Sequence, residues 1–322
     1  MSSRLALFLA ALSLSVAARA EQNIDPLNWL GRIVNAAQRL NYSGVFVYQS
    51  GEHTETSRIT HVVDNSGERE KLEVLDGSPR EVVRNNDEVR CFLPEQRVVI
   101  VERQPQRKSF PARLPSSLGN VTESYKIRKG DVGRVADRES QLLVLEPKDG
   151  YRYGHMLWAD VESGLLLKAR MVNEKNETIE QFYFTAVQIG GTIPKDALKP
   201  NLAPKSADWN VHNVPITDAN PGDTTWTFRN EIPGFRQSAG VKRSLRRDRP
   251  EAMHLVFSDG LAAMSVFIEP LGEERAAQGE TYSKGAISIY KRAHGDYMVT
   301  ALGEVPPRTL KKLADGMEPP RK

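Results

Sequence analysis

Short runs of β-branched and aromatic residues follow one another along more than half of the chain, and polar turns separate them. Side chains that alternate between apolar and polar over four to eight residues are typical of a strand with one buried face. The intervening turns are rich in Asn, Asp and Gly, so consecutive strands should pair as an antiparallel meander. The expected strands lie at 42–48, 57–63, 71–75, 89–93, 97–102, 124–127, 141–146, 153–160, 165–172 and 178–188.

One amphipathic helix precedes these strands. Asp25-Pro26 combines a helix cap with proline at the first helical position, and apolar residues then recur every three to four positions as far as Leu40. The pattern predicts a helix at 26–40. A large sheet with a single long helix is expected to curl around it as a half-barrel, and the concave face of such a sheet can hold a ligand. The predicted class is therefore α+β, mainly antiparallel β.

The length of the chain indicates a second, smaller domain, because about 300 residues exceed one comfortable hydrophobic core. Residues 191–223 carry several prolines and few apolar residues, which predicts an interdomain linker. We expect the half-barrel at 21–190 and an α+β domain at 224–318. The expected elements of this domain are strands at 226–228, 254–257, 262–269, 286–291 and 297–304, and a helix from Thr309 that ends at Gly316.

The first twenty residues have the pattern of a removable export signal. Arg4 is followed by an apolar run, and Ala18-Arg19-Ala20 places small residues at positions −3 and −1 of a cut before Glu21. An apolar run of about 13 residues is shorter than the roughly 20 that a spanning helix needs. We therefore expect a signal peptide at 1–20 and a mature protein that works outside the cytoplasmic membrane.

Charge and residue types argue against several classes of function. The chain has 44 basic and 41 acidic residues, and loss of the two leader arginines leaves a formal net charge of +1, so binding to nucleic acid by bulk charge is not expected. The six histidines are scattered, which argues against a metal site and against a hydrolase. Ser288 and Lys291 fit a Ser-x-x-Lys pattern, but strand alternation would turn them to opposite faces. We expect no catalytic residue and no cofactor.

A dense basic run at 242–249 is a candidate contact for a partner. Arginine side chains can hydrogen-bond the paired oxygens of an acidic peptide or of a phosphate-bearing lipid head group. The alternative is a solvated loop or strand edge. The candidate residues are Arg243, Arg246, Arg247 and Arg249.

A second candidate contact is the proline-rich segment 104–119, which shows no periodicity and should be a long loop. It is either a solvated connector or a flap that offers Phe110 and Leu114 to a partner.

Two expected strands are apolar on both faces and need cover on both. Within them, we expect Val99, Val101, Leu143 and Leu145 to line a cavity for an acyl chain. Each methylene group buried there would contribute about 0.8 kcal/mol. The alternative is that the helix covers one face and the sheet curls over its own core.

Several strings, in order along the chain, resemble the RseB/MucB family of periplasmic sigma-E regulators. They cover nearly the whole mature chain, and their order across two domains is more specific than any single string. In the first domain they are 43–48 (SGVFVY), 152–160 (RYGHMLWAD) and 163–168 (SGLLLK). In the second they are 233–235 (PGF), 257–261 (FSDGL), 265–270 (SVFIEP) and 299–307 (VTALGEVPP).

The resemblance implies a half-barrel similar to lipoprotein carriers and a second domain that binds the periplasmic part of a single-span anti-sigma factor, RseA or MucA. It implies that the chain shields this partner from a protease and is displaced by lipid, lipopolysaccharide or lipoprotein acyl chains. No catalytic motif is implied. The alternative function is a periplasmic lipid or lipoprotein carrier of the LolA/LolB type, which would share the first domain. The oligomeric state, including a homodimer, is left open.

Overall fold

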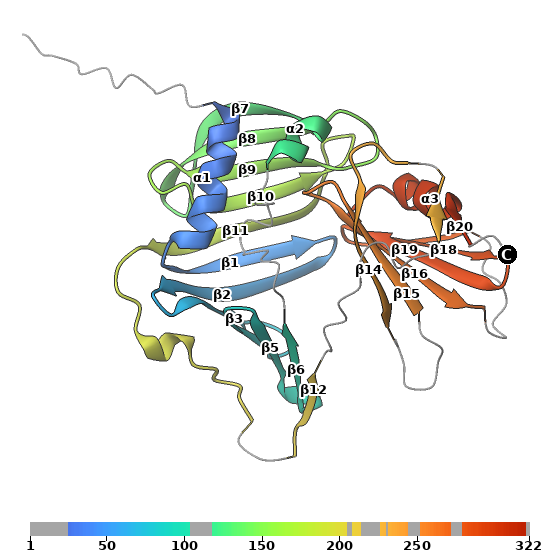
Figure 1. Cartoon of the computed structure of the whole chain (residues 1–322). Helices are drawn as coiled ribbons and strands as arrows, with labels where there is room; N and C mark the ends of the chain where they lie inside the picture. Colours follow the sequence, from blue (N-terminus) through green and yellow to red (C-terminus); the bar gives the residue numbers. More distant parts are fainter. Residues whose placement is uncertain are drawn as a thin grey trace, which may run out of the picture.

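Most of the chain forms two antiparallel sheets, a large one that curves around helix α1 and a smaller one beside it (Figure 1). The computed structural model describes residues 25–103, 118–204, 208–213, 226–229, 231–243, 252–271 and 279–319. The helices are α1 (Pro26–Arg39), α2 (Gly119–Ser124) and α3 (Pro307–Asp315). None of the helices described is long and apolar enough to cross a membrane.

The large sheet has 12 strands among the described residues, in the order β12-β6-β5-β4-β3-β2-β1-β11-β10-β9-β8-β7. It consists of two meanders joined where β1 pairs with β11. The strands are β1 (Tyr42–Ser50), β2 (His53–Asp64), β3 (Gly67–Val74), β4 (Glu81–Asn85), β5 (Glu88–Leu93), β6 (Val98–Arg103), β7 (Tyr125–Val135), β8 (Arg138–Pro147), β9 (Gly154–Asp160), β10 (Leu166–Val172), β11 (Thr178–Ile189) and β12 (Asn210–Asn213).

The junction between β1 and β11 depends on a glycine. A Cβ atom on Gly44 would lie 2.7 Å from the carbonyl oxygen of Ala186 and 2.8 Å from the ring of Phe184. The absence of a side chain therefore allows Phe184 to pack across the neighbouring strand.

Helix α1 fills part of the concave face, as the apolar spacing predicts. The helix begins at Pro26 and lies across the sheet (Figure 1), and a stripe of its side chains packs against the sheet. The buried residues of this stripe are Trp29, Leu30, Ile33, Ala36 and Ala37. Full burial of each large aliphatic side chain contributes roughly 1.5–3 kcal/mol, so this face fixes the helix on the sheet.

The segment expected as a linker lies against the large sheet where it is described. Glu81 is buried beside Lys71, 3.1 Å away, and its carboxylate accepts the backbone N–H groups of Asn201 and Leu202. Farther on, β12 pairs in parallel with β6. Backbone groups of Asn201, Leu202 and 210–213 thus tie this segment to the half-barrel, and Leu198 is buried near them.

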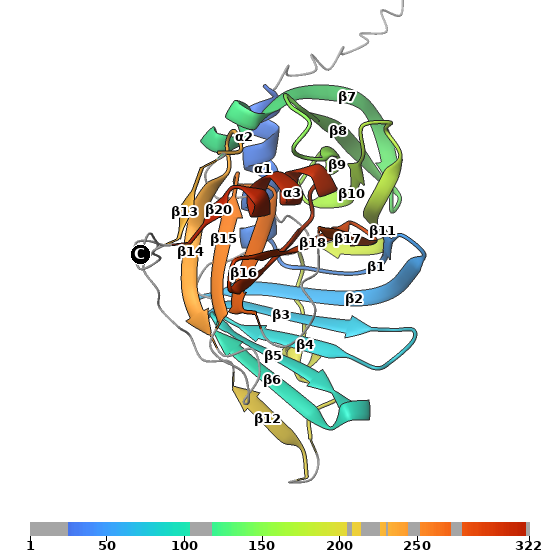
Figure 2. The same ribbon diagram turned by 90° about the vertical axis from the view of Figure 1, so that its right-hand side faces the viewer.

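The C-terminal domain is a six-stranded sheet in the order β14-β15-β16-β19-β18-β17, with α3 packed on one face (Figure 2). Leu310 and Leu313 of α3 are fully buried against this sheet. The strands are β14 (Arg236–Arg243), β15 (Ala252–Ser258), β16 (Ala263–Pro270), β17 (Glu280–Lys284), β18 (Ile287–His294) and β19 (Tyr297–Gly303), and β13 (Thr227–Phe228) pairs with β20 (Met317–Glu318) beside them.

The predicted fold class is confirmed: a large, mainly antiparallel sheet wraps one helix and a smaller sheet domain follows. The sequence did not reveal β4, β12, β14, β17 or β20. The expected signal peptide lies outside the described residues.

Candidate functional site

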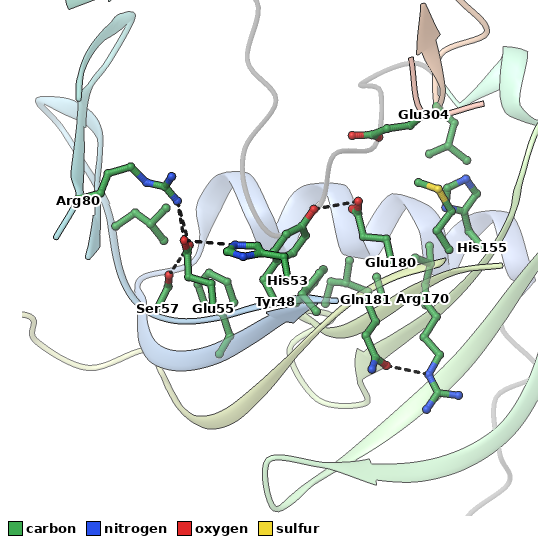
Figure 3. Close-up of a pocket in the computed structure, with 18 residues that line it drawn as sticks. Tyr48, His53, Glu55, Ser57, Arg80, His155, Arg170, Glu180, Gln181 and Glu304 are labelled. Atoms are coloured by element: carbon green, nitrogen blue, oxygen red, sulfur yellow. Dashed lines mark hydrogen bonds and ion pairs between the residues drawn. The ribbon is translucent and has the colours of Figure 1, made fainter. Parts of the chain in front are cut away.

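A cavity of about 460 Å³ opens on the concave face of the large sheet, beside helix α1 (Figure 3). Its floor consists of apolar side chains from the central strands, which point inward by strand alternation. These side chains are Phe46, Leu72, Leu157, Leu166, Ala169, Met171 and Phe182. A concave apolar surface of this kind is suited to a hydrocarbon chain.

Aromatic side chains at the junction of β1 and β11 make the floor rigid. Phe46 lies with its ring centroid 6.3 Å from that of Phe182 and 5.8 Å from that of Phe184, in both cases edge to face. Such pairs contribute about 0.5–1.5 kcal/mol beyond the burial of their area. Successive side chains of a strand point to opposite faces of the sheet, and this alternation along both strands places all three rings on the concave face.

The rim of the cavity is polar. Arg80 donates from Nη2 to both carboxylate oxygens of Glu55, at 2.9 and 3.0 Å. On the other side, the Tyr48 hydroxyl donates to Glu180 at 2.9 Å (Figure 3). An apolar floor beneath a charged rim matches the chemistry of an acyl chain attached to a polar head.

The C-terminal domain supplies part of the cavity wall. Leu261, in the turn between β15 and β16, lines the cavity together with Glu304, which follows β19. Leu261 packs against the core of the half-barrel, and Tyr151 of the half-barrel packs against the core of the C-terminal domain. The cavity therefore depends on how the two domains are placed.

A buried ion pair connects the domains at this boundary. Arg152 donates from Nη1 to Oδ2 of Asp259 at 2.5 Å, and both side chains are fully buried. Arg152 also donates to the carbonyl of Pro233 and to the carboxylate of Asp149. We call Arg152, Asp149, Asp259, Pro233 and Phe235 the interdomain latch.

The surroundings of the latch favour one geometry. The guanidinium of Arg152 lies 4.8 Å from the ring centroid of Phe235. Between Pro233 and Phe235, Gly234 has a φ of +77°, and a Cβ atom there would clash with Oγ of Ser124 and lie 3.3 Å from Nη1 of Arg152. Glycine is thus required both by the backbone conformation and by the close approach of Ser124.

Asp259 is held by its own turn as well as by Arg152. Its Oδ1 accepts the backbone N–H groups of Leu261, at 2.9 Å, and Ala262, at 2.7 Å. Burial raises the pKa of Asp259, and these hydrogen bonds and Arg152 act in the opposite direction. The turn that holds the carboxylate also places Leu261 in the cavity.

Helix α3 binds the loop that carries Arg152. Arg308 donates to the carbonyl of Gly150 at 2.5 Å, and the Thr309 hydroxyl donates to the carbonyl of Tyr151 at 2.8 Å. Lys312 donates to the Tyr151 hydroxyl at 3.2 Å. These bonds to backbone and side chain fix the loop against the second domain.

His155 lies between the cavity and the latch. It lines the cavity, and its ring centroid is 5.9 Å from that of Tyr125, whose ring in turn lies 5.7 Å from the guanidinium of Arg152. Burial lowers the pKa of His155 to about 4. The imidazole is therefore neutral at neutral pH.

This pKa predicts a loss of stability in mild acid. Below about pH 6.5 the unfolded chain takes up a proton on His155 that the folded protein does not accept until about pH 4. Stability contributed by the neutral ring is thus present above pH 6.5 and decreases as the pH falls toward 4, by about 2 kcal/mol because the ring keeps partial contact with water. Urea unfolding of the native protein and of His155→Phe should diverge below pH 6.5, and parallel curves would contradict the assignment.

Two family models match most of the chain. The MucB/RseB N-terminal domain matches residues 25–202, and the MucB/RseB C-terminal domain matches residues 220–318. The chain belongs to the MucB/RseB family. The sigma factor AlgU regulatory protein MucB of Pseudomonas aeruginosa is 33% identical over 97% of this chain and 96% of its own length. The sigma-E factor regulatory protein RseB of Escherichia coli K12 is 25% identical over 88% of this chain and 87% of its own length.

Solved structures of MucB are similar to this chain across both domains. A crystal structure of MucB in complex with MucA(peri) has 28% identity, covers 92% of this chain and 100% of that chain, and gives a TM-score of 0.73. A complex of Pseudomonas aeruginosa MucA and MucB, with the same identity and coverage, gives 0.75. A crystal structure of MucB with no partner named, which covers 92% of this chain and 98% of that chain, gives 0.62.

Three of the strings that resemble MucB/RseB proteins meet at the latch. The string at 152–160 begins with Arg152, and 233–235 supplies the carbonyl and the ring that contact it. The string at 257–261 contains Asp259 and the cavity residue Leu261. The resemblance inferred from the sequence is confirmed, and the structure places its strings together.

The four residues expected to line a lipid cavity lie elsewhere on the sheet. Leu143 and Leu145 are buried in the core that α1 covers. Val99 and Val101 are in β6, and Val99 is buried. The cavity is formed by other side chains of the concave face, and lipid contact with these four stays a prediction.

The candidate partner contacts fall largely outside the described residues. Phe110 and Leu114 lie outside them, as do Arg246, Arg247 and Arg249. Arg243 ends β14, and its side chain is not described. Contact of these residues with a partner stays a prediction.

The sequence did not reveal the latch. Arg152 and Asp259 each lie beside a turn, where a charged residue is expected to be solvated. The only available signal was that both belong to strings typical of the family. Within the described part of the chain, no group of three or more His, Cys, Asp or Glu residues could hold a metal ion.

Proposed function

We propose that this chain is a periplasmic binding protein that holds the periplasmic domain of a MucA-like anti-sigma factor and so restrains an envelope-stress sigma factor. The observation that carries the proposal is the match of both domains to MucB in complex with MucA(peri). The TM-scores with two such complexes, 0.73 and 0.75, exceed the 0.62 with MucB for which no partner is named. The overall arrangement of this chain is thus more similar to MucB in these two complexes than to MucB in the third structure.

In this role the chain acts by binding and not by catalysis. A bound protein removes a segment from a protease by covering it and by restricting the extended conformation that cleavage requires. The closed latch contributes by holding both domains in the arrangement that the partner binds.

Lipid is the proposed release signal. The cavity offers an apolar floor and the charged groups of Arg80, Glu55 and Glu180 at its rim. Burial of four methylene groups contributes about 3 kcal/mol, or roughly a 100-fold change in an equilibrium constant. An acyl chain that favours one domain arrangement can therefore oppose a partner that favours another.

The turn between β15 and β16 can couple lipid binding in the cavity to the latch. Leu261 lines the cavity. The carboxylate of Asp259, two residues earlier, pairs with Arg152 and accepts a hydrogen bond from the N–H of Leu261. An acyl chain that displaces Leu261 must move the turn that carries Asp259. Lipid binding would then weaken the latch, and a closed latch would disfavour lipid by the same free energy.

A lipid or lipoprotein carrier of the LolA/LolB type remains the alternative function. Such a carrier needs the half-barrel but has no evident need for a second domain. Here the C-terminal domain supplies Leu261 and Glu304 to the cavity wall. This sharing favours a regulator in which lipid controls the placement of the domains.

The mature chain is expected to bind the soluble periplasmic domain of a MucA-like protein with a Kd on the order of micromolar or below, measured by isothermal titration calorimetry. It should also slow cleavage of that domain by the protease that initiates its degradation. An unrelated substrate of the same protease controls for direct inhibition of the enzyme. No saturable binding, or cleavage at an unchanged rate under saturating protein, would contradict the proposal.

A further inference from the structure

Two neighbouring cross-strand rows on the outer face of the large sheet contain no acidic residue. Strand alternation turns their side chains away from α1; Arg170 and Gln181 also border the cavity, but their side chains extend away from its other lining residues (Figure 3). The first row is Leu142, Trp158, Lys168, Tyr183 and Val47, on β8, β9, β10, β11 and β1. The second row, on the same strands, is Val144, Met156, Arg170, Gln181 and Gln49. We call these ten residues the outer patch.

Aromatic rings hold the two cations of the outer patch. Nζ of Lys168 lies 4.9 Å from the ring centroid of Trp158 and 5.8 Å from that of Tyr183. Cζ of Arg170 lies 5.6 Å from the Trp158 ring, and its Nε donates to Gln181 at 3.2 Å. All of these side chains are partly exposed. The patch thus presents a fixed pair of positive charges on an aromatic surface.

The cations are not neutralised by the sheet. Neither Lys168 nor Arg170 forms an ion pair within the described part of the chain. The acids at the borders of the patch are engaged elsewhere, since Glu146 pairs with Arg128 and Asp160 pairs with Arg138, each at 2.6 Å. Partial burial, together with the charge of Arg170, lowers the pKa of Lys168, an effect that a nearby anion would reverse.

We propose that the outer patch docks this protein onto the anionic phospholipid head groups of a bilayer surface. Trp and Tyr are enriched at the head-group level of membranes, where one end of the ring is apolar and the other wet. Lys and Arg beside them attract lipid phosphates. The apolar members Leu142, Met156 and Val47 complete a surface suited to the boundary between head groups and acyl chains.

The position of the patch favours a lipid surface over an acidic peptide. Its strands are interior strands of the sheet, so their backbone groups are already paired and cannot add a peptide strand. Docking through the outer face also leaves the cavity and the C-terminal domain on the side away from the bilayer. Both remain accessible to a membrane-anchored partner. The inference does not depend on the proposed function.

Vesicle flotation tests the proposal with the mature chain. Vesicles of equal parts phosphatidylglycerol and phosphatidylcholine should bind the protein at low salt, and pure phosphatidylcholine should not. Removing both charges in Lys168→Gln/Arg170→Gln should weaken binding roughly 30-fold, since each cation near such a surface contributes about a fivefold effect. Higher salt should weaken the binding of the native protein in the same direction.

A matched control separates the patch from bulk charge. Arg134→Gln/Lys199→Gln removes the same charge at two exposed sites outside the patch and should bind like the native protein. The proposal would be overturned if both double variants lost vesicle binding equally, or if the patch variant lost none. Failure of the native protein to bind anionic vesicles would also overturn it. So would displacement of the protein from intact vesicles by polyglutamate at an equal concentration of negative charge. Thermal unfolding near the native Tm verifies that each variant is folded.

Discussion

Replacing Arg152 with methionine is expected to lower the free energy of unfolding by about 3–5 kcal/mol, because it leaves the carboxylate of Asp259 buried without its counter-ion. Both side chains are completely buried in the folded protein. The same variant should lose affinity for the MucA-like periplasmic domain, because the two domains would no longer be held in the arrangement seen here. Urea unfolding measures the first effect, and titration calorimetry on the fraction that remains folded measures the second.

A matched substitution shows whether burial is responsible for the effect. Arg128 pairs with Glu146 on the surface, where the two side chains are 51% and 43% exposed. Arg128→Met should therefore cost less than about 1 kcal/mol. Similar losses in Arg128→Met and Arg152→Met would contradict the role given to the latch.

A double variant separates the stability of the latch from its specificity. Arg152→Met/Asp259→Asn removes both charges and should recover part of the lost stability, because the asparagine carbonyl can still accept the N–H groups of Leu261 and Ala262 and no unpaired charge stays buried. We expect partner affinity to recover less than stability, since the hydrogen bonds to Pro233 and Asp149 that orient the loop remain absent.

Strand alternation located the long strands whose inward side chains reach the core, although β7 continues to Val135, eight residues beyond its predicted end at 127. β1 and β11 begin at the predicted positions, because buried and less buried residues alternate along them, as at Tyr42, Gly44 and Phe46 of β1. β4 was missed for a physical reason. A glutamate is expected on the surface, but Glu81 is buried. Its carboxylate pairs with Lys71 and accepts backbone N–H groups that lie more than 100 residues away in the sequence.

The candidate site was harder to predict than the fold, since it depends on contacts between the domains. The sequence indicated that Leu143 and Leu145 face inward, but it could not show that α1 covers that part of the concave face and leaves Ala169 and Phe182 open. The latch joins Arg152 to Asp259, which are 107 positions apart in the sequence, and a local sequence pattern cannot predict such a pair. Likewise, β12 has four exposed side chains and is held by its backbone alone.

The substitution Ala169→Phe is expected to abolish the response to lipid while leaving the protein folded. Ala169 lies on the cavity floor between Leu157 and Phe182 in adjacent strands, so a phenyl ring would occupy the space proposed for an acyl chain. The cavity of about 460 Å³ has room for the ring. Stability should therefore change by less than about 1.5 kcal/mol, while affinity for a fluorescent fatty acid should fall at least about tenfold.

The informative measurement is the partner complex with and without lipid. Fatty acid should displace the MucA-like domain from the native protein but not from Ala169→Phe, because the variant cannot take up the chain that moves Leu261 and the Asp259 turn. Ala186→Phe, which adds the same ring at an exposed position on the outer face of β11, should behave like the native protein. If Ala169→Phe still released its partner with added lipid, the signal would act outside the cavity. If it lost partner binding without lipid, the cavity floor would be part of the partner interface itself.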